Sequence, residues 1–592
     1  MVVAKAVRGG MPVRSRVRRR RIRALAFALM MTFTAGASNE KDGEATSSTN
    51  ATTVATNKPN IVLLVLDDIG YADVGFHGSD FVTPNIDGLA KSGVELDRMY
   101  VMPQCSPTRA AIMTGRHSWK TGMQHFTTIL PGSPAALPST VQTLAESMKS
   151  AGYSTHAIGK WHLGNAKWEN TPLGRGFDTY LGYLQGQTDY YNRSILSCGK
   201  FACLFPFNCA SGFKLKNPPT CDHPDASPYG PDANGYDFWR NKGIALDHHG
   251  KYTVDDYEAE FQSIVGNRGT EPFFVYYAEQ LLHIPIEAPP EPKYLERCVA
   301  DGVVGGYAGT NRTILCSMAA RMDDAVGNLV STLKQAGIWN NTLIFAVSDN
   351  GGMTAWGDAF PASASSNWPL RGGKTTLFDG GVRSVSFVSG GFLPDAARGK
   401  RVTSLLHATD IFPTLAHIAG ADVSGVDGIN AWPVITGTDN KTRSEIPLNI
   451  AMNQDLTTFG IRNPLAKNAK SANYTAMISW PWKLILGNSY LIPGQHEIVP
   501  RSGWWKIKPY DYIAPPASEK GAGVLLFDLS KDEGEHTNLA DVHPDVVDKL
   551  TKRVYDYYLN ATASGYEKPQ FNAAQRKANP KLHNWSWAPF DG

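Results

Sequence analysis

The sequence has no long hydrophobic run, little excess charge of either sign and only 7 cysteines among 592 residues. The apolar run from Ala24 to Phe33 is shorter than the roughly 20 residues that a membrane-spanning helix needs, so we expect no transmembrane anchor. Charged residues make up 19% of the chain and hydrophobic residues 42%, which excludes a coiled coil and a disordered chain. The composition is instead that of a globular protein with a substantial core.

A cluster of positive charge lies at the N-terminus, where nine basic residues precede the first acidic residue, Glu40. The apolar run follows them and leads into Thr34-Ala35-Gly36-Ala37. A basic stretch, an apolar stretch and an Ala-x-Ala site are typical of a secretory signal peptide, which we assign to residues 1–37. Residues 38–58, rich in Ser, Thr and Asn, are then a flexible leader. An arm that binds nucleic acid is the alternative interpretation of the arginines.

Cleavage near Ala37 would leave 48 basic and 54 acidic residues, a net charge of −6. Such a chain does not coat a polyanion, so we expect no nucleic-acid partner, and any anionic substrate must be held by a local cluster of positive groups. The expected destination is the secretory pathway, lysosomal or extracellular, and we expect several of eight Asn-x-Ser/Thr sequons to be glycosylated. These are Asn50, Asn192, Asn311, Asn340, Asn440, Asn473, Asn560 and Asn584.

Cysteines of a secreted chain are expected to form disulfides. Four of them cluster at residues 198, 203, 209 and 221, and Cys298 and Cys316 flank a short loop. We predict a Cys298–Cys316 bridge and leave the other pairings open, with a zinc site at 198–221 as the alternative. Cys105 is the odd one out.

Alternating strand and helix patterns predict an α/β fold, with a large doubly wound, mostly parallel sheet domain over residues 59–435. Asn60 to Leu66 is a continuous apolar run, typical of a strand buried on both faces. Further strands are predicted at 154–159, 273–278, 342–347 and 384–389, and the clearest helices at 140–150 and 316–335. Residues 436–592 are predicted to form a smaller C-terminal α+β domain, with short strands from Trp482 and Val524 and a helix near 543–558.

Polar residues follow several predicted strands, at the sheet edge where open α/β proteins bind ligands. They are Asp67 and Asp68, Lys160 and His162, His283, and Asp349 and Asn350. Three carboxylates and an amide brought together need a cation, and an all-oxygen set indicates Ca²⁺ or Mg²⁺. Each residue taken singly also fits a turn or a helix cap, and His283 also fits a satisfied core histidine.

The most specific motif is Cys105-Ser-Pro107-Thr-Arg109, followed by Thr114-Gly-Arg116. Pro107 suits the first turn of a helix, which would place Cys105 at a helix N-terminus, where amide groups favour an anion. An unpaired core cysteine is the alternative interpretation.

This motif resembles the signature of the type I, formylglycine-dependent sulfatases of the alkaline phosphatase superfamily. The segment from Gly152 through Lys160-Trp161-His162 to Gly164 is similar to the second signature of that family. Leu282-His283-Ile-Pro285 and the run Asn367 to Lys374 resemble the arylsulfatase B, or N-acetylgalactosamine-4-sulfatase, group.

The resemblance implies that a formylglycine-generating enzyme converts Cys105 to Cα-formylglycine, which hydrates to a geminal diol. It implies a Ca²⁺ site made of Asp67, Asp68, Asp349 and Asn350 together with a diol oxygen of residue 105. The remaining residues that it implies are Arg109 at the diol, Lys160 and Lys374 at the sulfate oxygens, His283 near the leaving-group oxygen, and His162 at the second hydroxyl.

The chemistry of sulfate-ester cleavage suits this set. Charge develops on the bridging oxygen, so catalysis needs a nucleophile, positive groups at the other oxygens and an acid at the leaving group. The expected substrate is an aryl sulfate or a sulfated sugar, with N-acetylgalactosamine 4-sulfate favoured by resemblance. A phosphonate or phosphoester hydrolase on the same scaffold, and a secreted glycan-binding protein that keeps its thiol, are the alternatives.

Overall fold

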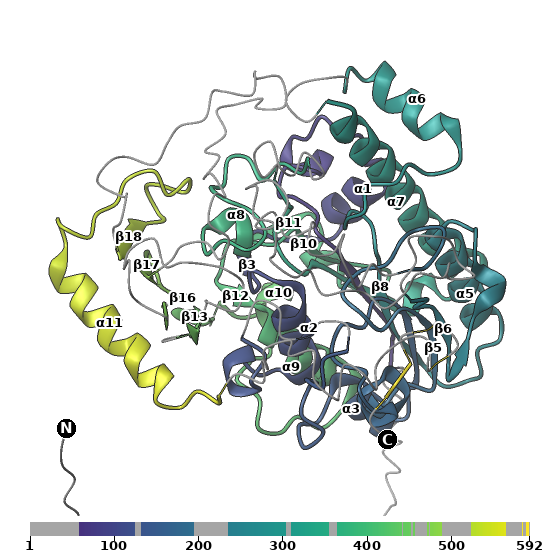
Figure 1. Ribbon diagram of the computed structural model, residues 1–592, viewed down its shortest axis with the longest axis horizontal. Helices are drawn as coiled ribbons and strands as arrows, with labels where there is room; N and C mark the ends of the chain where they lie inside the picture. Colours follow the sequence, from purple (N-terminus) through teal and green to yellow (C-terminus); the bar gives the residue numbers. More distant parts are fainter. Residues whose placement is uncertain are drawn as a thin grey trace, which may run out of the picture. The chain divides into compact units, whose positions relative to one another are not determined.

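The structure is a computed structural model (Figure 1). It describes residues 58–124, 129, 132–194, 235–303, 309–354, 364–440, 442–451, 454–455, 471–472, 474–487, 523–563, 583, 586 and 588–590. The chain divides into two units, Met1–Thr56 and Asn57–Gly592, and all described residues belong to the second. The predicted signal peptide and nearly all of the predicted leader lie outside the described residues.

The larger unit is built on a ten-stranded sheet with the order β11-β2-β10-β9-β1-β8-β4-β5-β6-β7. Its strands are β1 Asn60–Leu66, β2 Val94–Leu96, β4 Ser154–Gly159, β5 Thr179–Gly182, β6 Trp239–Arg240, β7 Gly243–Ile244, β8 Phe273–Ala278, β9 Thr342–Ser348, β10 Ser386–Ser389 and β11 Lys400–Val402. Strands β9, β1, β8, β4 and β5 are parallel neighbours, whereas β10 runs antiparallel to both β9 and β2. The predicted mostly parallel sheet is confirmed, with antiparallel strands toward both edges.

Helices cover both faces of this sheet. The described α-helices of this part of the chain are α1 Pro84–Ser92, α2 Cys105–Thr114, α3 Leu144–Ser150, α5 Thr253–Gly266, α6 Pro292–Ala300, α7 Gly309–Gln335, α8 Asp379–Val382, α9 Ile411–Ala419 and α10 Trp432–Thr436. Figure 1 draws α1, α5 and α7 on one side of the sheet and α2, α3 and α9 on the other.

The alternation of side chains along β1 explains why helices pack on both faces of the sheet. Val62, Leu64 and Leu66 pack in one buried cluster with α1, α5 and α7, while the odd-numbered Ile61, Leu63 and Val65 pack with α2, α3 and α9. Successive side chains of a strand point to opposite faces, so a continuous apolar run is what a doubly covered strand requires.

Two helix boundaries differ from the prediction for identifiable reasons. α3 begins at Leu144 instead of residue 140, because Thr143 caps it in a capping box with Glu146. α7 begins at Gly309 instead of residue 316, although its first turns contain Gly and β-branched residues of low helix propensity. Tertiary contacts hold this segment, since the buried Arg312 donates to Asp73 at 2.6 Å.

The C-terminal part forms a four-stranded antiparallel sheet, ordered β13-β16-β17-β18, with one long helix. These elements are β13 Glu445–Asn449, β16 Tyr474–Ser479, β17 Trp482–Gly487, β18 Val524–Asp528 and α11 Pro544–Tyr558. One face packs on α11, and the other shares a buried cluster with Tyr100, Leu377, Phe378 and Val382 of the preceding part. The predicted α+β character is confirmed, and the boundary at 435/436 stays a prediction.

Two small sheets complete the described strands, β3 Met99–Tyr100 with β12 Leu406–His407, and β14 Gln454–Asp455 with β15 Ser471–Ala472. The predicted Cys298–Cys316 disulfide is present and joins α6 to α7. The cysteines at 198–221 lie outside the described residues. Of the sequons, Asn192, Asn340, Asn440 and Asn560 are exposed. Among the described residues, no helix is both long and apolar enough to span a membrane.

Candidate active site

Four neighbouring parallel strands end at one edge of the large sheet and carry most of the polar residues of the site. The order β9-β1-β8-β4 brings their carboxyl ends together. The residues that follow them are Asp349 and Asn350 after β9, Asp67 and Asp68 after β1, His283 after β8, and Lys160 and His162 after β4. The structure therefore brings these polar residues together at one edge of the sheet, and ligand binding there stays a prediction.

Cys105 is the first residue of α2, as the motif predicted. Gln104 before it is extended, with φ −148° and ψ 153°, and Pro107 sits in the first turn, where its missing N–H costs nothing. Arg109 follows one turn later on the same face of the helix. Cys105 is 5% exposed and is the free cysteine among the residues that the structure describes.

Three carboxylates and one amide cluster at the strand ends, all of them buried. Asn350 Nδ2 donates to Asp68 Oδ1 at 2.7 Å, and the backbone N–H of Asp68 faces Asp349 Oδ1 at 3.5 Å. Asp67 Oδ1 and Asn350 Oδ1 are buried and have no hydrogen-bond partner within the described part of the chain. Two orphaned oxygens among three carboxylates form a donor set that suits a hard divalent cation such as Ca²⁺.

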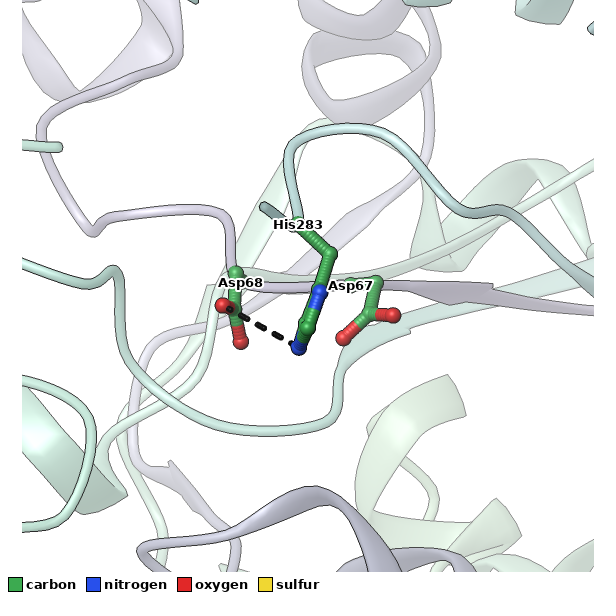
Figure 2. Close-up of side chains that lie close together, drawn as sticks. All are labelled: Asp67, Asp68 and His283. Atoms are coloured by element: carbon green, nitrogen blue, oxygen red, sulfur yellow. Dashed lines mark ion pairs between the residues drawn. The ribbon is translucent and has the colours of Figure 1, made fainter. Parts of the chain in front are cut away.

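Figure 2 shows the imidazole of His283 between the carboxylates of Asp67 and Asp68. One ligand atom from each of these three residues lies within 4.8 Å of the others, and His283 Nε2 is 3.8 Å from Asp68 Oδ2. Asp67 and Asp68 therefore belong both to the predicted set of oxygen ligands and to this group with His283. Because Ca²⁺ prefers oxygen ligands, His283 fits better as a neighbour of the ion than as its ligand.

Three buried cations face these carboxylates. Arg109 donates to Asp349 Oδ2 through Nε at 2.9 Å, and its Nη2 is 3.9 Å from Asp67 Oδ2. Lys160 Nζ donates to Asp67 Oδ2 at 2.7 Å, and Lys374 Nζ lies 2.7 Å from Asp68 Oδ1. Burial alone would lower the pKa values of Arg109 and Lys374, but neighbouring negative groups raise both, so the two side chains stay charged.

The charges of this cluster balance, three against three, before any divalent cation is added. A bound Ca²⁺ would leave an excess of positive charge in a site where most side chains are shielded from water. Such an excess attracts an anion strongly because screening is weak there. The site is therefore suited to an anionic substrate.

His162 is oriented by a backbone carbonyl. Its Nε2 is 3.0 Å from the carbonyl oxygen of Ile129, and its Nδ1 is 3.1 Å from Cys105 Sγ. A carbonyl can only accept, so Nε2 carries the proton and Nδ1 presents a lone pair to residue 105. Burial, reinforced by Lys160, lowers the pKa of His162 well below its usual value and keeps the ring neutral.

His283 has the opposite tautomer. Its Nδ1 donates to the carbonyl oxygen of Ile284 at 2.7 Å, so Nε2 is the unprotonated nitrogen and faces Asp68. Burial, reinforced by Lys374 and Lys160, lowers the pKa of His283 well below its usual value. The ring can act as an acid only after Nε2 gains a proton, which an anion bound beside it would favour.

Three residues in or beside this site have unfavourable backbone angles. Asp68, His162 and Thr375 have φ angles of 60°, 54° and 74°, in the left-handed region that non-glycine residues avoid. Each is a site residue or adjoins one, since Thr375 follows Lys374. Such strain persists only where the surrounding structure fixes the backbone, and it is common at functional sites.

All ten residues singled out from the sequence meet at this site, and the structure adds two contacts that sequence reasoning missed. The hydroxyl of Tyr276 accepts from Arg109 Nη1 at 3.0 Å, and the carbonyl of Ile129 fixes His162. Tyr276 lies inside the continuous apolar run of β8, so no polar pattern marked it. Ile129 acts through its backbone, which side-chain patterns do not reveal.

Comparisons with known proteins show which family the chain resembles. The chain matches the protein-family model Sulfatase over residues 59–421. It is 32% identical over 553 residues to arylsulfatase J of Mus musculus, covering 91% of this chain and 81% of that protein. It is 27% identical over 569 residues to N-acetylgalactosamine-6-sulfatase of Sus scrofa, covering 90% and 91% of the two chains.

A solved structure, the crystal structure of Ps i-CgsB in complex with k-i-k-neocarrahexaose, is similar with a TM-score of 0.64 and 25% sequence identity. The likeness covers 89% of this chain and 99% of that chain.

Proposed function

The chain belongs to the sulfatase family, as a type I sulfatase of the alkaline phosphatase superfamily, and on that premise we propose that it acts through formylglycine made from Cys105 and through Ca²⁺. It is a sulfuric ester hydrolase that acts on aryl or sugar sulfates. The particular likeness to the arylsulfatase B group stays a prediction.

The observation that carries the mechanism is the position of Cys105. It lies at the N-terminus of α2, 3.1 Å from the unprotonated nitrogen of His162 and among buried cations. Burial raises the pKa of its thiol, and Lys160 and Lys374 offset this only in part, so an unmodified residue 105 would be a protonated, weak nucleophile. Formylglycine at this position would supply, as its hydrate, one hydroxyl group to attack sulfur and a second to release sulfate afterwards.

Asp67, Asp68, Asp349 and Asn350 are the residues that we propose hold Ca²⁺. The unpaired oxygens of Asp67 and Asn350 support this assignment because a buried acceptor without a partner is costly. The ion would supply positive charge that favours deprotonation of the attacking group.

Side chains of the protein would bind the substrate, hold residue 105 and transfer protons. Lys160 and Lys374 would bind the non-bridging sulfate oxygens, exchanging part of their contact with Asp67 and Asp68 for the substrate. Arg109, fixed by Asp349 and Tyr276, would hold residue 105 in place. His162 would accept a proton at Nδ1, and His283, protonated at Nε2, would donate to the leaving-group oxygen.

The natural substrate that we propose is a sulfated carbohydrate. The names of relatives support this, since one is an N-acetylgalactosamine-6-sulfatase and a similar structure contains k-i-k-neocarrahexaose. N-acetylgalactosamine 4-sulfate is the first candidate to test. We further propose that the protein matures in the secretory pathway, where a formylglycine-generating enzyme oxidises Cys105 and the exposed sequons receive glycans, and that it is lysosomal or extracellular.

Mass spectrometry of the peptide that contains Cys105, from secreted protein, tests the proposal directly. We expect an aldehyde or its hydrate in place of the thiol, and a retained thiol in active protein would refute the assignment. Cys105→Ala should keep the fold and lose turnover of 4-nitrophenyl sulfate. A clear preference of the native protein for 4-nitrophenyl phosphate would instead favour a phosphoester hydrolase.

A further inference from the structure

Lys374 lies in a loop that has no regular structure of its own. It follows the segment 364–373 and precedes α8, and its backbone N–H donates to the carbonyl of Gly352 at 3.1 Å. The next residue, Thr375, has a φ of 74°, which is unfavourable for a β-branched side chain. The position of the Lys374 ammonium therefore depends on what fixes this strained turn.

The four-stranded C-terminal sheet supplies a direct contact to the turn. The hydroxyl of Tyr474, at the start of β16, donates to the carbonyl oxygen of Thr375 at 2.9 Å. Tyr474 is 2% exposed and packs in the buried cluster that the two parts of the chain share. A buried hydrogen bond from a rigid ring to the backbone beside Lys374 restricts that turn strongly.

Both flanks of the loop are tied to the C-terminal part as well. Lys483 of β17 is fully buried and contacts Asp379 Oδ1 and Glu535 Oε1, each at 2.7 Å. Glu535 Oε2 accepts from the backbone N–H of Asp379 at 2.6 Å, and the Glu535 carbonyl accepts from Arg371 Nη1 at 2.6 Å. The segment from Arg371 to Asp379, with Lys374 inside it, is thus held at three points.

Apolar packing in the shared buried cluster already attaches the C-terminal sheet to the preceding part of the chain. Buried ion pairs add little net stability, because desolvation offsets much of their attraction, but separating the partners is costly, so the pairing resists rearrangement. The network of Lys483, Glu535 and Asp379 therefore indicates a requirement for position, and the group that it surrounds is the Lys374 loop.

We propose that Tyr474 is a positioning residue for Lys374, and that through it the C-terminal sheet sets where the Lys374 ammonium meets the substrate. The inference rests on the proposed role of Lys374 at the sulfate oxygens. Tyr474 does not touch the reacting atoms; it acts through the carbonyl of Thr375.

Tyr474→Phe removes the hydroxyl and keeps the ring, so the fold should survive. We expect kcat/KM for 4-nitrophenyl sulfate to fall about tenfold, the loss equivalent to about 1.4 kcal/mol of transition-state binding. Tyr236→Phe is the matched control: Tyr236 is fully buried and its hydroxyl donates to the carbonyl of Ala245 at 2.6 Å, near the β6–β7 edge of the sheet. The control should lose stability to a similar degree and keep kcat/KM.

A double-mutant cycle separates positioning from a general structural effect. In a Lys374→Met background, Tyr474→Phe should cause no further loss of kcat/KM, because the group that it positions is gone. An equal loss in both backgrounds, or an unchanged kcat/KM in Tyr474→Phe alone, would overturn the proposal. Failure of the proposed role of Lys374 has a different signature, since Lys374→Met alone would then keep the native kcat/KM for 4-nitrophenyl sulfate.

Discussion

At the scale of single residues, the site depends on which neighbour each polar atom has. The same residue type has two protonation patterns, because a backbone carbonyl contacts Nε2 of His162 and Nδ1 of His283. The nitrogen left without a proton faces residue 105 in one case and Asp68 in the other. The proposed base and the proposed acid are thus distinguished by carbonyl groups and not by the histidines themselves.

Asp349→Ala should weaken Ca²⁺ binding at least about tenfold, since it removes one of three carboxylates from the proposed site. It should also lower the free energy of unfolding by about 3 kcal/mol, because the buried Arg109 loses the carboxylate that it contacts most closely. Calcium titration and urea unfolding measure the two effects.

The control for Asp349 is Asp256→Ala, which removes the carboxylate that pairs with the buried Arg193 and is not one of the proposed Ca²⁺ ligands. It should reduce stability similarly and leave Ca²⁺ affinity unchanged. Unchanged metal content in Asp349→Ala would count against the ligand set.

Glu279, directly after β8, makes the free energy of unfolding depend on pH. Burial raises its pKa from 4.5 to about 7, so the folded protein keeps a proton that the unfolded chain has lost. The stabilisation of the fold by this buried, protonated carboxyl group is complete below about pH 4.5 and is lost as pH rises through about 7. Glu279→Gln, which keeps the acceptor for the N–H of Gln280, removes this loss.

Relative to the native protein, Glu279→Gln should gain about 3 kcal/mol in unfolding free energy at pH 8 and much less at pH 5. Urea unfolding of both proteins at the two pH values measures the difference. An equal effect at pH 5 and pH 8 would show that Glu279 does not titrate as its burial indicates.

At the scale of elements, most polar residues of the site lie directly after the ends of strands. Gly159 ends β4 immediately before Lys160, with a φ of 91°, and a Cβ built there would lie 1.9 Å from the carbonyl oxygen of Ala278. Only glycine lets β4 and β8 approach this closely at the strand ends.

Gly159→Ala should therefore displace Lys160 and lower kcat/KM about a hundredfold, as a misplaced group at the reacting centre does. Gly152→Ala is the matched control, since Gly152 has a similar φ of 85° and nothing within 4 Å of its Cβ position. It should cost about 1 kcal/mol in stability and leave the rate unchanged. Equal rates in the two variants would contradict the close-approach argument.

At the scale of the whole described unit, the C-terminal sheet shares one buried cluster with residues of the preceding part of the chain. Tyr100, Leu377 and Phe378 pack with Ile446, Ile478 and Phe527 of the C-terminal part. Separating the chain at residue 436 would expose these side chains on both sides of the break.

Residues 59–435 and 436–592, expressed separately, should therefore neither unfold cooperatively nor hydrolyse 4-nitrophenyl sulfate, whereas the joined chain 59–592 should do both. Calorimetry and the turnover assay measure these outcomes. A fragment 59–435 with full activity would show that the C-terminal sheet is dispensable, and it would also contradict the role of Tyr474.

Strand β1 and the start of α2 could be predicted because their signals are local: a continuous apolar run ending in two aspartates, and a proline two residues after Cys105. The early start of α7 could not be predicted, because the contact of Arg312 with Asp73 joins residues 239 positions apart. The carbonyl of Ile129 and the hydroxyls of Tyr276 and Tyr474 were missed for the same reason.

The sequence by itself determined which residue types stand at each strand end and helix start, since hydrophobic period and motif spacing are local properties of the chain. Only the tertiary structure decided which nitrogen of each histidine is free, which carboxylate pairs with which cation, and that a distant tyrosine supports the Lys374 loop. Those choices depend on distances between segments far apart in sequence, and folding sets them by packing the segments together.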